Sequence, residues 1–175
     1  MEFEFKNAEI GGIVFIKRKY FPDNRGSLTK EYETTPFYET IKESFKEEYI
    51  SVSKKHVLRG LHFQKSPKSQ GKLISVIKGE IFDVAVDIRE QSKDYLKHIT
   101  KYMSAESRES IWIPPGFAHG FLSLSEESIV INRCTNEFDP SLEWGIRWND
   151  PKLSIKWPIN TPLLSEKDKN WPLLL

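Results

Sequence analysis

Apolar and polar residues alternate along much of this chain, as they do in β-strands. In residues 81–89 every second side chain is apolar, and the apolar set is Phe82, Val84, Val86 and Ile88. This pattern is typical of a strand that is buried on one face only. Similar short runs, separated by Gly, Pro, Ser or Asn, lie at residues 11–18, 49–55, 57–63, 72–80, 109–115, 120–126, 128–134 and 144–148. Many short strands with frequent turn signals predict a mostly β fold, either a sandwich or a barrel.

Two segments are consistent with short helices at the periphery of this fold. The first begins at Thr35 and Pro36, because proline is favoured at the first helical position. Its apolar face would be formed by residues at four-residue spacing, Phe37, Ile41 and Phe45. A second helix, near residues 165–171, would end at Pro172.

Length and composition narrow the class of protein. The 175 residues contain no internal repeat, low-complexity tract or linker, which favours a single domain covering residues 1–175. The hydrophobic fraction of 38% and the aromatic fraction of 13% exclude a disordered chain. Lys and Arg number 26 against 25 Asp and Glu, so the net charge gives no reason to expect nucleic acid or a membrane as a partner.

The single cysteine, Cys134, excludes an intramolecular disulfide and fits a reducing compartment. The first ten residues are charged throughout and lack the basic and apolar regions of a signal peptide. The longest apolar stretch near them, Ile10 to Ile16, is far shorter than the ~20 residues that a membrane span needs. We therefore expect a cytoplasmic protein.

His62 is the first candidate for chemistry. On a regular strand, Gly60, His62 and Gln64 share one face, and Gly60 would leave room for a ligand beside His62. Arg59 would lie on the opposite face. The alternative is a histidine whose hydrogen bonds are satisfied within the core.

Three further residues have both a functional and a structural interpretation. His119 lies between two glycines and shortly after two prolines, so we expect it in or beside a turn. Lys72 starts a predicted strand, where it either meets a substrate or is solvated. Asp168 follows Ser165 in the S-x-x-[DE] pattern that caps the start of a helix.

Metal and cofactor motifs are missing from the sequence. A metal site of the barrel type needs closely spaced histidines with a nearby carboxylate, whereas the residue two positions after His62 is Gln64. There is no glycine-rich phosphate loop, no zinc-type cysteine pair, and no Ser or Cys beside a base. We therefore expect neither a metal nor a cofactor.

Several motifs together carry a resemblance to one family. They are DNRGSLTKEY at residues 23–32, VLRGLHFQ at 57–64, QGKLISVIKGEIFDVAVDIR at 70–89, IWIPPGFAHGFLSLSE at 111–126 and GIRWNDPKLSIKWP at 145–158. From about Gly12 to Pro172 the chain resembles the dTDP-4-dehydrorhamnose 3,5-epimerase family of nucleotide-sugar enzymes. The resemblance implies a cupin-type jelly-roll β-sandwich, an active site without metal, and a homodimer.

The resemblance also implies roles for the candidate residues. The family's general base, a histidine held by an aspartate, matches His62 and Asp168. Its lysine, which stabilises an enolate, matches Lys72. Arg59 and His119 match positions in the substrate pocket.

Three more residues complete the expected substrate contacts. Gln64 and Lys167 lie next to the catalytic candidates in the sequence. Arg25 matches an arginine that, in the family, reaches the nucleotide diphosphate from the partner subunit.

The chemistry expected of these residues is removal of a proton next to a ketone. In a 4-keto sugar the hydrogens on C3 and C5 are both alpha to the C4 carbonyl. A neutral imidazole with a pKa near ~6.5 can accept one of them, an adjacent carboxylate fixes its tautomer, and an ammonium stabilises the enolate oxygen. We therefore expect an isomerase, a nucleotide-sugar 3-epimerase or 3,5-epimerase that serves the synthesis of surface polysaccharide such as capsule or lipopolysaccharide. A 3,4-ketoisomerase and a non-catalytic sugar-nucleotide binding protein are the alternatives.

The chain departs from the family at the residue that delivers the second proton. That donor is a tyrosine in the family, and its position here holds Asn132, which shares a strand face with Val130 and Cys134. A carboxamide donates hydrogen bonds but no proton at neutral pH, whereas a phenol with a pKa near ~10 is a proton donor. We therefore expect inversion at C3 only, with water or another group delivering the proton.

A second departure concerns the nucleotide. Leu28 replaces a ring that packs on thymine in the family, and Lys30 replaces a glutamate. Glu47 and Tyr49 stand where the family usually has Gln and Asn. Because Arg25 is kept while these residues differ, we expect a base other than thymine, with GDP preferred to dTDP. The sugar, hexose or heptose, stays open.

Overall fold

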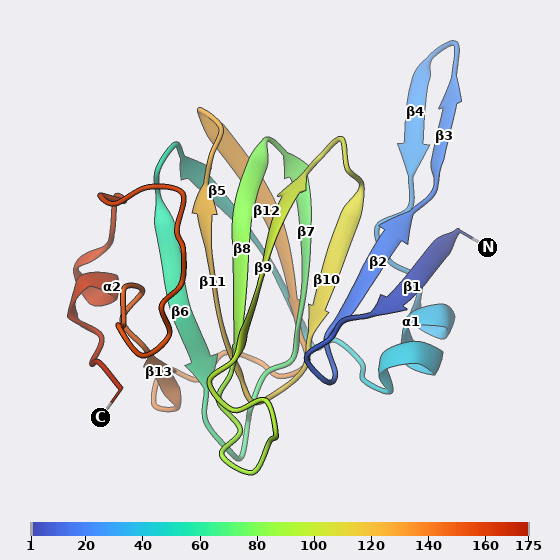
Figure 1. Cartoon of the computed structure of the whole chain (residues 1–175). Coiled ribbons are helices and arrows are strands. Elements are labelled where there is room, and N and C mark those ends of the chain that lie inside the picture. Colours follow the sequence, from blue (N-terminus) through green and yellow to red (C-terminus); the bar gives the residue numbers. More distant parts are fainter. Residues whose placement is uncertain (1, 175) are drawn as a thin grey trace.

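The computed structural model describes residues 2–174, which form two antiparallel sheets packed face to face (Figure 1). The six-stranded sheet has the order β1 (Phe3–Asn7), β2 (Val14–Arg18), β10 (Glu109–Ile113), β7 (Lys72–Lys78), β12 (Glu127–Cys134) and β5 (Glu47–Lys54). The five-stranded sheet has the order β13 (Glu143–Gly145), β6 (Leu58–Gln64), β11 (Phe117–Ser123), β8 (Glu80–Asp87) and β9 (His98–Ser104). The mostly β fold predicted from the alternation and the cupin type that the resemblance implies are both confirmed.

The main core lies between the two sheets. It combines side chains of the six-stranded sheet, such as Ile74 and Val130, with side chains of the five-stranded sheet, such as Ile81, Ala85 and Met103, all of them 1% exposed or less. Each run predicted as a strand overlaps an observed one. Four strands were not predicted, namely β1, β9 and the short hairpin of β3 (Tyr20–Asp23) and β4 (Gly26–Thr29).

The prediction that residues 81–89 form a strand buried on one face only is wrong. In β8 every residue after Glu80 is buried, including Asp83 and Asp87. The reason is that residues 146–174 cross the outer face of the five-stranded sheet and cover it. Their apolar side chains, among them Trp157 with its ring 5.6 Å from that of Phe82, form a second core there.

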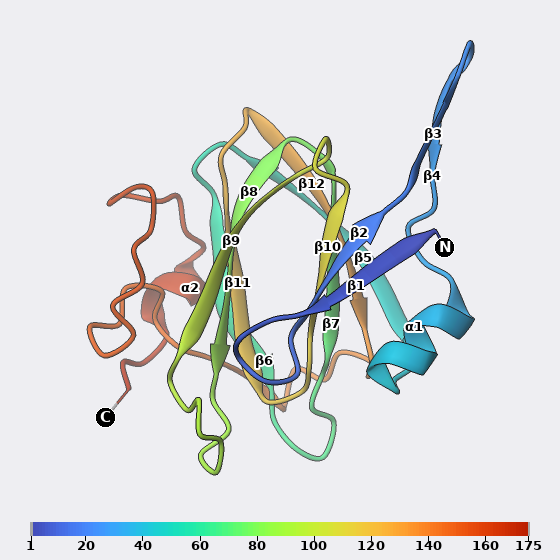
Figure 2. The same ribbon diagram turned by 45° about the vertical axis from the view of Figure 1, so that its right-hand side comes forward.

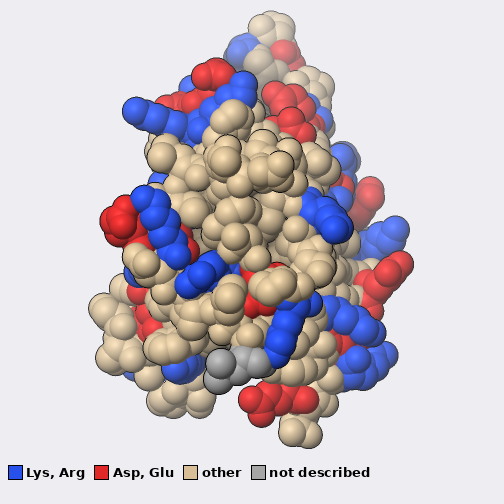
Figure 3. Space-filling view, turned by 60° about the vertical axis from the view of Figure 1, so that its left-hand side comes forward, with Lys and Arg blue, Asp and Glu red and all other residues tan. Residues whose placement is uncertain are grey.

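The C-terminal segment that covers this sheet is attached at the start of β6. Leu163 accepts a hydrogen bond from the amide of Leu58 (3.0 Å) and donates one to the carbonyl of His56 (2.7 Å). Figure 3 shows the side of the molecule on which this segment lies in Figure 1, with a largely uncharged middle and charged margins. The segment is therefore part of the folded body and can hold side chains in fixed positions.

Both predicted helices exist, with small differences. α1 (Thr34–Ile41) begins one residue before Thr35, ends before Phe45, and buries Phe37 against the outer face of the six-stranded sheet. Phe45 lies outside the helix but packs on the same cluster. α2 (Glu166–Asn170) begins after Ser165, whose hydroxyl accepts a hydrogen bond from the amide of Asp168 (3.1 Å).

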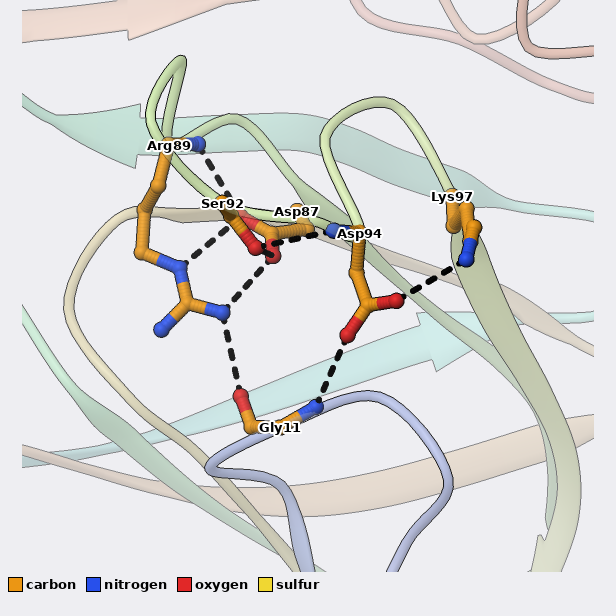
Figure 4. Close-up of polar contacts among 6 residues, drawn as sticks. All are labelled: Gly11, Asp87, Arg89, Ser92, Asp94 and Lys97. Atoms are coloured by element: carbon orange, nitrogen blue, oxygen red, sulfur yellow. Dashed lines mark hydrogen bonds and ion pairs between the residues drawn. The ribbon is translucent and has the colours of Figure 1, made fainter.

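Two loops at one end of the sandwich are joined by the polar network in Figure 4. The guanidinium of Arg89 pairs with the carboxylate of Asp87 (2.9 and 2.7 Å) and donates to the carbonyl of Gly11 (3.0 Å). Asp94 accepts from the amide of Gly11 (3.4 Å) and pairs with Lys97 (2.9 Å). The network connects the β1–β2 loop to the β8–β9 loop.

The β3–β4 hairpin is a separate two-stranded sheet and belongs to neither sheet of the sandwich. It projects away from the sandwich next to the N-terminal strands, as Figures 1 and 2 both show. Leu28, in β4, is 61% exposed. An arm of this shape makes few contacts with its own chain.

Candidate functional site

His62 and Asp168 meet although 106 residues separate them in the sequence. Nε2 of His62, on β6, lies 2.5 Å from Oδ1 of Asp168, on α2. The helix cap expected for Asp168 is also present, because its backbone amide binds Ser165 while its carboxylate is left for His62. Both interpretations of Asp168 therefore hold.

The environment of Asp168 keeps its carboxylate ionised. Burial alone would raise the pKa of this carboxyl group, but the hydrogen bond and charge of His62 and the polar groups of Ser165 and Trp171 outweigh it and hold the pKa below its usual value. An ionised Asp168 accepts the Nε2 proton of His62. Nδ1 is then the ring nitrogen without a proton, which can act as a base.

A β-bulge places Arg59 on the same side as His62. In the pairing of β6 with β11, His119 faces His62 and Phe121 faces Arg59, so three residue steps on β6 match two on β11. The prediction that Arg59 lies on the opposite face is therefore wrong. Both side chains line one cavity.

Gly60 permits this bulge rather than leaving room for a ligand. Its φ is +123°, and a Cβ atom there would lie 2.5 Å from the Cα of Gly120 and 2.7 Å from the carbonyl oxygen of His119. The space beside Gly60 is thus filled by the backbone of β11. The expected ligand space is elsewhere, between the two sheets.

That space is a cleft made of two adjoining cavities. The larger, of about 540 Å³, is lined by Tyr49, Ile50, Ser51, Val52, Arg59, His62, Lys72, His119, Phe121, Asn132, Glu143, Ser165, Lys167 and Asp168. The smaller, of about 270 Å³, is lined by Glu47, Tyr49, His62, Phe63, Gln64, Gln70, Lys72, Phe138 and Glu143. The structure therefore brings the three catalytic candidates together, since all of them line the larger cavity.

Lys72 is buried at the start of β7 and is not the solvated lysine of the alternative interpretation. Only 8% of its surface is exposed. Burial lowers the pKa of its ammonium group, and the nearby Glu143, Asp83 and Glu47 act in the opposite sense. A cation in such a place interacts strongly with any negative charge that develops in the cleft.

His119 lies within β11 and not in a turn, which corrects the expectation from its neighbouring glycines. It is 5% exposed, and its Nε2 lies 2.8 Å from Oδ2 of Asp83 on the adjacent strand β8. The other oxygen of Asp83, Oδ1, is buried and has no hydrogen-bond partner among the described residues. The cleft thus contains a second histidine–aspartate pair.

Three further predicted contacts also line the larger cavity. Arg59 is held by the hydroxyl of Ser53 and the carbonyl of Val52 (both 3.0 Å). Asn132 is 3% exposed, and its amide group donates weakly to the hydroxyl of Ser51 (3.4 Å). Lys167 pairs with both carboxylate oxygens of Glu143 (2.7 and 2.9 Å). Glu143 was not among the residues predicted from the sequence.

The predicted contact Gln64 has a structural task. Its amide group donates to the carbonyls of Lys68 (2.5 Å) and Glu137 (3.1 Å), and its oxygen accepts from the amide of Asp139 (2.8 Å). Its side chain therefore ties two loops together beside the smaller cavity. Its hydrogen bonds are already used by the chain itself.

Three predicted nucleotide contacts lie outside the cleft of their own chain. Arg25, on the β3–β4 hairpin, pairs with Asp23 (2.6 Å), and its side chain is 84% exposed. Leu28 and Lys30 line neither cavity of the cleft. These three residues are therefore not brought together with His62 within one chain.

Besides Glu143, two residues beside the histidines of the cleft were not predicted from the sequence. The ring of Trp171 lies 6.0 Å from that of His62, and Asp83 supports His119. A carboxylate directly between two apolar residues of a predicted strand was the available signal for Asp83. Trp171 had no comparable signal, because a single tryptophan near a chain end is common.

A cavity larger than either part of the cleft is not the candidate site. It measures about 1070 Å³, lies between β1 and β9, and contains none of the predicted site residues. Among residues 2–174, no group of three or more His, Cys, Asp or Glu could hold a metal ion. No helix in that range is long and apolar enough to cross a bilayer.

Comparison with known proteins assigns the family. The family model described as dTDP-4-dehydrorhamnose 3,5-epimerase matches residues 7–175. The enzyme of that name from Salmonella typhimurium is 44% identical over 168 residues, which cover 94% of this chain and 92% of its own. A dTDP-4-dehydrorhamnose 3-epimerase from Streptomyces niveus is 34% identical over 167 residues, with 94% and 81% covered.

Solved structures agree with this match. The crystal structure of dTDP-6-deoxy-D-glucose-3,5-epimerase from Legionella pneumophila, in complex with dTDP-4-keto-L-rhamnose, superposes with a TM-score of 0.94 at 38% identity. The superposition covers 98% of this chain and 92% of that one. With the fold, the cleft and these matches in agreement, the chain belongs to the dTDP-4-dehydrorhamnose 3,5-epimerase family of isomerases.

Proposed function

We propose that this chain epimerises a nucleoside-diphosphate 4-keto-6-deoxy sugar, hexose or heptose, through an enolate, with His62 as the base. The observation that carries the proposal is the 2.5 Å contact between His62 and Asp168 inside a cleft that also contains a buried lysine. Nδ1 of His62 takes the hydrogen on C3, which the neighbouring C4 ketone makes acidic. Asp168 stabilises the imidazolium that forms.

Lys72 stabilises the other product of this step, the enolate oxygen on C4. A positioned base contributes roughly 10²–10⁴ in rate, which is too little for a carbon acid without stabilisation of the oxyanion. Lys72 comes from the sheet opposite His62, so base and cation reach the sugar from different sides. His119 and Arg59 lie along the same cleft and are positioned to contact the sugar or its phosphates.

We infer inversion at C3 only. Asn132 lines the cleft but cannot give up a proton at neutral pH, which argues against the second protonation that inversion at C5 requires. Relatives of this chain are named both as 3,5-epimerases and as a 3-epimerase, so membership of the family is compatible with either outcome.

The nucleotide is proposed to lie partly on a second copy of the chain. The exposed arm with Arg25 and Leu28 reaches away from its own cleft and fits a homodimer in which it completes the partner's site. On the edge strand β5, beside the larger cavity, Ile50 and Val52 are 58% and 53% exposed, which is apolar surface suited to such an interface. Light scattering at several protein concentrations measures the oligomeric state.

The identity of the base and the location of the protein remain predictions. Relatives are named for dTDP sugars, whereas Leu28 and Tyr49 favour a base other than thymine and hence GDP. Calorimetric titration with dTDP and GDP separates the two. A cytoplasmic location and a role in surface-polysaccharide synthesis agree with this reaction class and can be tested by fractionation and gene deletion.

One experiment tests the reaction. The protein is incubated in D₂O with dTDP-4-keto-6-deoxyglucose and with GDP-4-keto-6-deoxymannose, and the ring hydrogens are followed by NMR. Inversion at C3 alone places deuterium at C3 and leaves the configuration at C5 unchanged. Deuterium with inversion at both carbons would refute the argument from Asn132, a ketone at C3 would indicate the ketoisomerase, and no exchange would indicate a binding protein.

Two variants assign the residues. His62→Ala should abolish exchange, and exchange at the wild-type rate would show that His62 is not the base. Asn132→Tyr should add exchange at C5. If it adds none, other residues of the cleft control that carbon.

A further inference from the structure

Inversion of a carbon requires a proton from the face opposite the one that was deprotonated. His62 belongs to the five-stranded sheet, so under the proposed function the donor must come from the six-stranded sheet across the cleft. Asn132, on β12 of that sheet, has no proton to give. The structure must therefore contain another donor, or the proton comes from water.

The six-stranded sheet offers few groups that can act. Lys72 faces the developing oxyanion and is needed there as a cation. The carboxylate of Glu47 accepts a hydrogen bond from the amide of Phe138 (2.6 Å) and lines only the smaller cavity. The hydroxyl of Ser51 is much less acidic than a phenol. Tyr49 remains.

Tyr49 is the direct cross-strand partner of Asn132. In the antiparallel pairing of β5 with β12, Asn132 faces Tyr49, so the two side chains leave the sheet on the same side. Tyr49 lines both cavities of the cleft, as do His62 and Lys72. The phenol missing at position 132 is thus present one strand away, on the same face of the same sheet.

The surroundings keep this phenol protonated until it is needed. Partial burial raises the pKa of Tyr49, Cys134 and Glu47 act in the same sense, and the nearby Arg59 lowers the pKa. The residue as a whole is 42% exposed, so it lies at the mouth of the cleft. Solvent can therefore return a proton to the oxygen after each turnover.

We propose that Tyr49 is the catalytic acid that protonates C3 on the face opposite His62. The O–H bond of Tyr49 breaks as the new C–H bond forms at C3, and the electrons of the enolate oxygen re-form the C4 carbonyl. His62 passes the hydrogen that it removed to solvent, and the phenolate of Tyr49 regains a proton from water, so both groups return to their starting protonation states. The proposal rests on His62 being the base.

Tyr49→Phe tests this assignment, because it removes only the acidic hydroxyl group. In D₂O with dTDP-4-keto-6-deoxyglucose or GDP-4-keto-6-deoxymannose, whichever the wild type converts, inversion at C3 should fall by roughly 10²-fold or more. Deuterium should still enter C3 with retained configuration within a few-fold of the wild-type rate, because His62 can return a solvent deuteron to the face it deprotonates. Exchange without inversion is therefore the expected result.

The other outcomes overturn specific parts of the argument. Unchanged inversion would show that Tyr49 is not the donor and would leave His62 unaffected. Loss of both exchange and inversion in a folded variant would place Tyr49 in substrate binding instead. No exchange by the wild-type protein with either sugar nucleotide would overturn the proposed function itself.

Two further variants serve as controls. Tyr95→Phe makes the same change at a tyrosine that is equally exposed, at 42%, but lines neither cavity, and it should leave both rates unchanged. The double substitution of Tyr49→Asn and Asn132→Tyr moves the phenol from β5 to β12. Inversion should recover in the double variant relative to Tyr49→Asn alone, and a failure to recover would contradict a proton-donating role.

Discussion

Replacing Asp168 by asparagine isolates the contact on which the base depends. The side chain keeps its size, and the helix cap is unaffected because it uses the amide of Asp168 and the hydroxyl of Ser165. The carboxamide can, however, present its NH₂ group to Nε2 of His62 at the present distance of 2.5 Å. Nδ1 would then carry the proton and could not accept one from the sugar.

The expected loss follows from two effects, the wrong tautomer and an imidazolium without its counter-charge. Removing such an orienting carboxylate lowers the rate by about 10²–10⁴-fold. At about 1.4 kcal/mol for each factor of ten, the barrier rises by roughly 3–5 kcal/mol. Affinity for the nucleoside diphosphate should change little, because Asp168 lies beside the base.

The assay is deuterium incorporation at C3, followed by NMR at neutral pH, where Asp168 is ionised. Glu126→Gln makes the same carboxylate-to-amide change at the surface, where the side chain of Glu126 is 88% exposed, and it should leave the exchange rate unchanged. An exchange rate in Asp168→Asn within threefold of wild type would refute the reasoning that Asp168 orients His62.

A pH series adds an independent measurement. The pKa of Asp168 is lower in the folded chain than in the unfolded one, so its ionisation stabilises the fold above the unfolded value of about 4. This contribution is lost as the pH falls through the folded value. Urea unfolding should therefore show a smaller loss of stability on acidification for Asp168→Asn than for wild type.

Three more predictions follow from the same structure. Lys72→Met should lower inversion by about 10²–10³-fold. It should also raise the free energy of unfolding at neutral pH by on the order of 1–3 kcal/mol, because burial disfavours the charged form, and this gain should vanish above about pH 10. Gly60→Ala should destabilise the fold by about 3 kcal/mol or more in urea unfolding, since its Cβ would meet the backbone of Gly120 and its φ is +123°. Arg25→Ala should weaken calorimetric binding of dTDP or GDP roughly tenfold or more, with stability changed by less than about 0.5 kcal/mol.

The alternation of apolar residues was sufficient to predict most strands and the mostly β class, because side chains in a two-layer β-sandwich must point alternately in and out, whereas the cupin type came from the resemblance. It failed for β8 because periodicity within one strand carries no information on what covers the outer face. That face is covered by residues far along the chain, including Trp157 and Leu164. β9, whose residues are mostly partly exposed, has too weak an alternation to stand out.

The site was predictable from motifs only as far as regular geometry holds. His62, Lys72 and Asp168 meet as expected, although one of them comes from a helix after the last strand. Arg59 was placed on the wrong face because a single extra residue in β6 shifts its side chain by one position, and a regular strand was assumed. The pairing of Tyr49 with Asn132 could not be read from either segment alone, since register is a property of two strands together.

The route of the C-terminal segment has a consequence for how the enzyme responds to heat. The partner of the base is carried by the C-terminal strap of residues 146–174, outside the sandwich. Ile146 and Leu153 of this strap are buried, but most of its apolar side chains, among them Ile159 and Leu164, are only partly buried. A brief detachment of this strap would separate Asp168 from His62 while both sheets stay paired. Catalytic activity should therefore be lost at a lower temperature than the circular-dichroism signal of the sheets. Anchoring the strap to the sandwich should raise the temperature at which activity is lost more than repacking the core would.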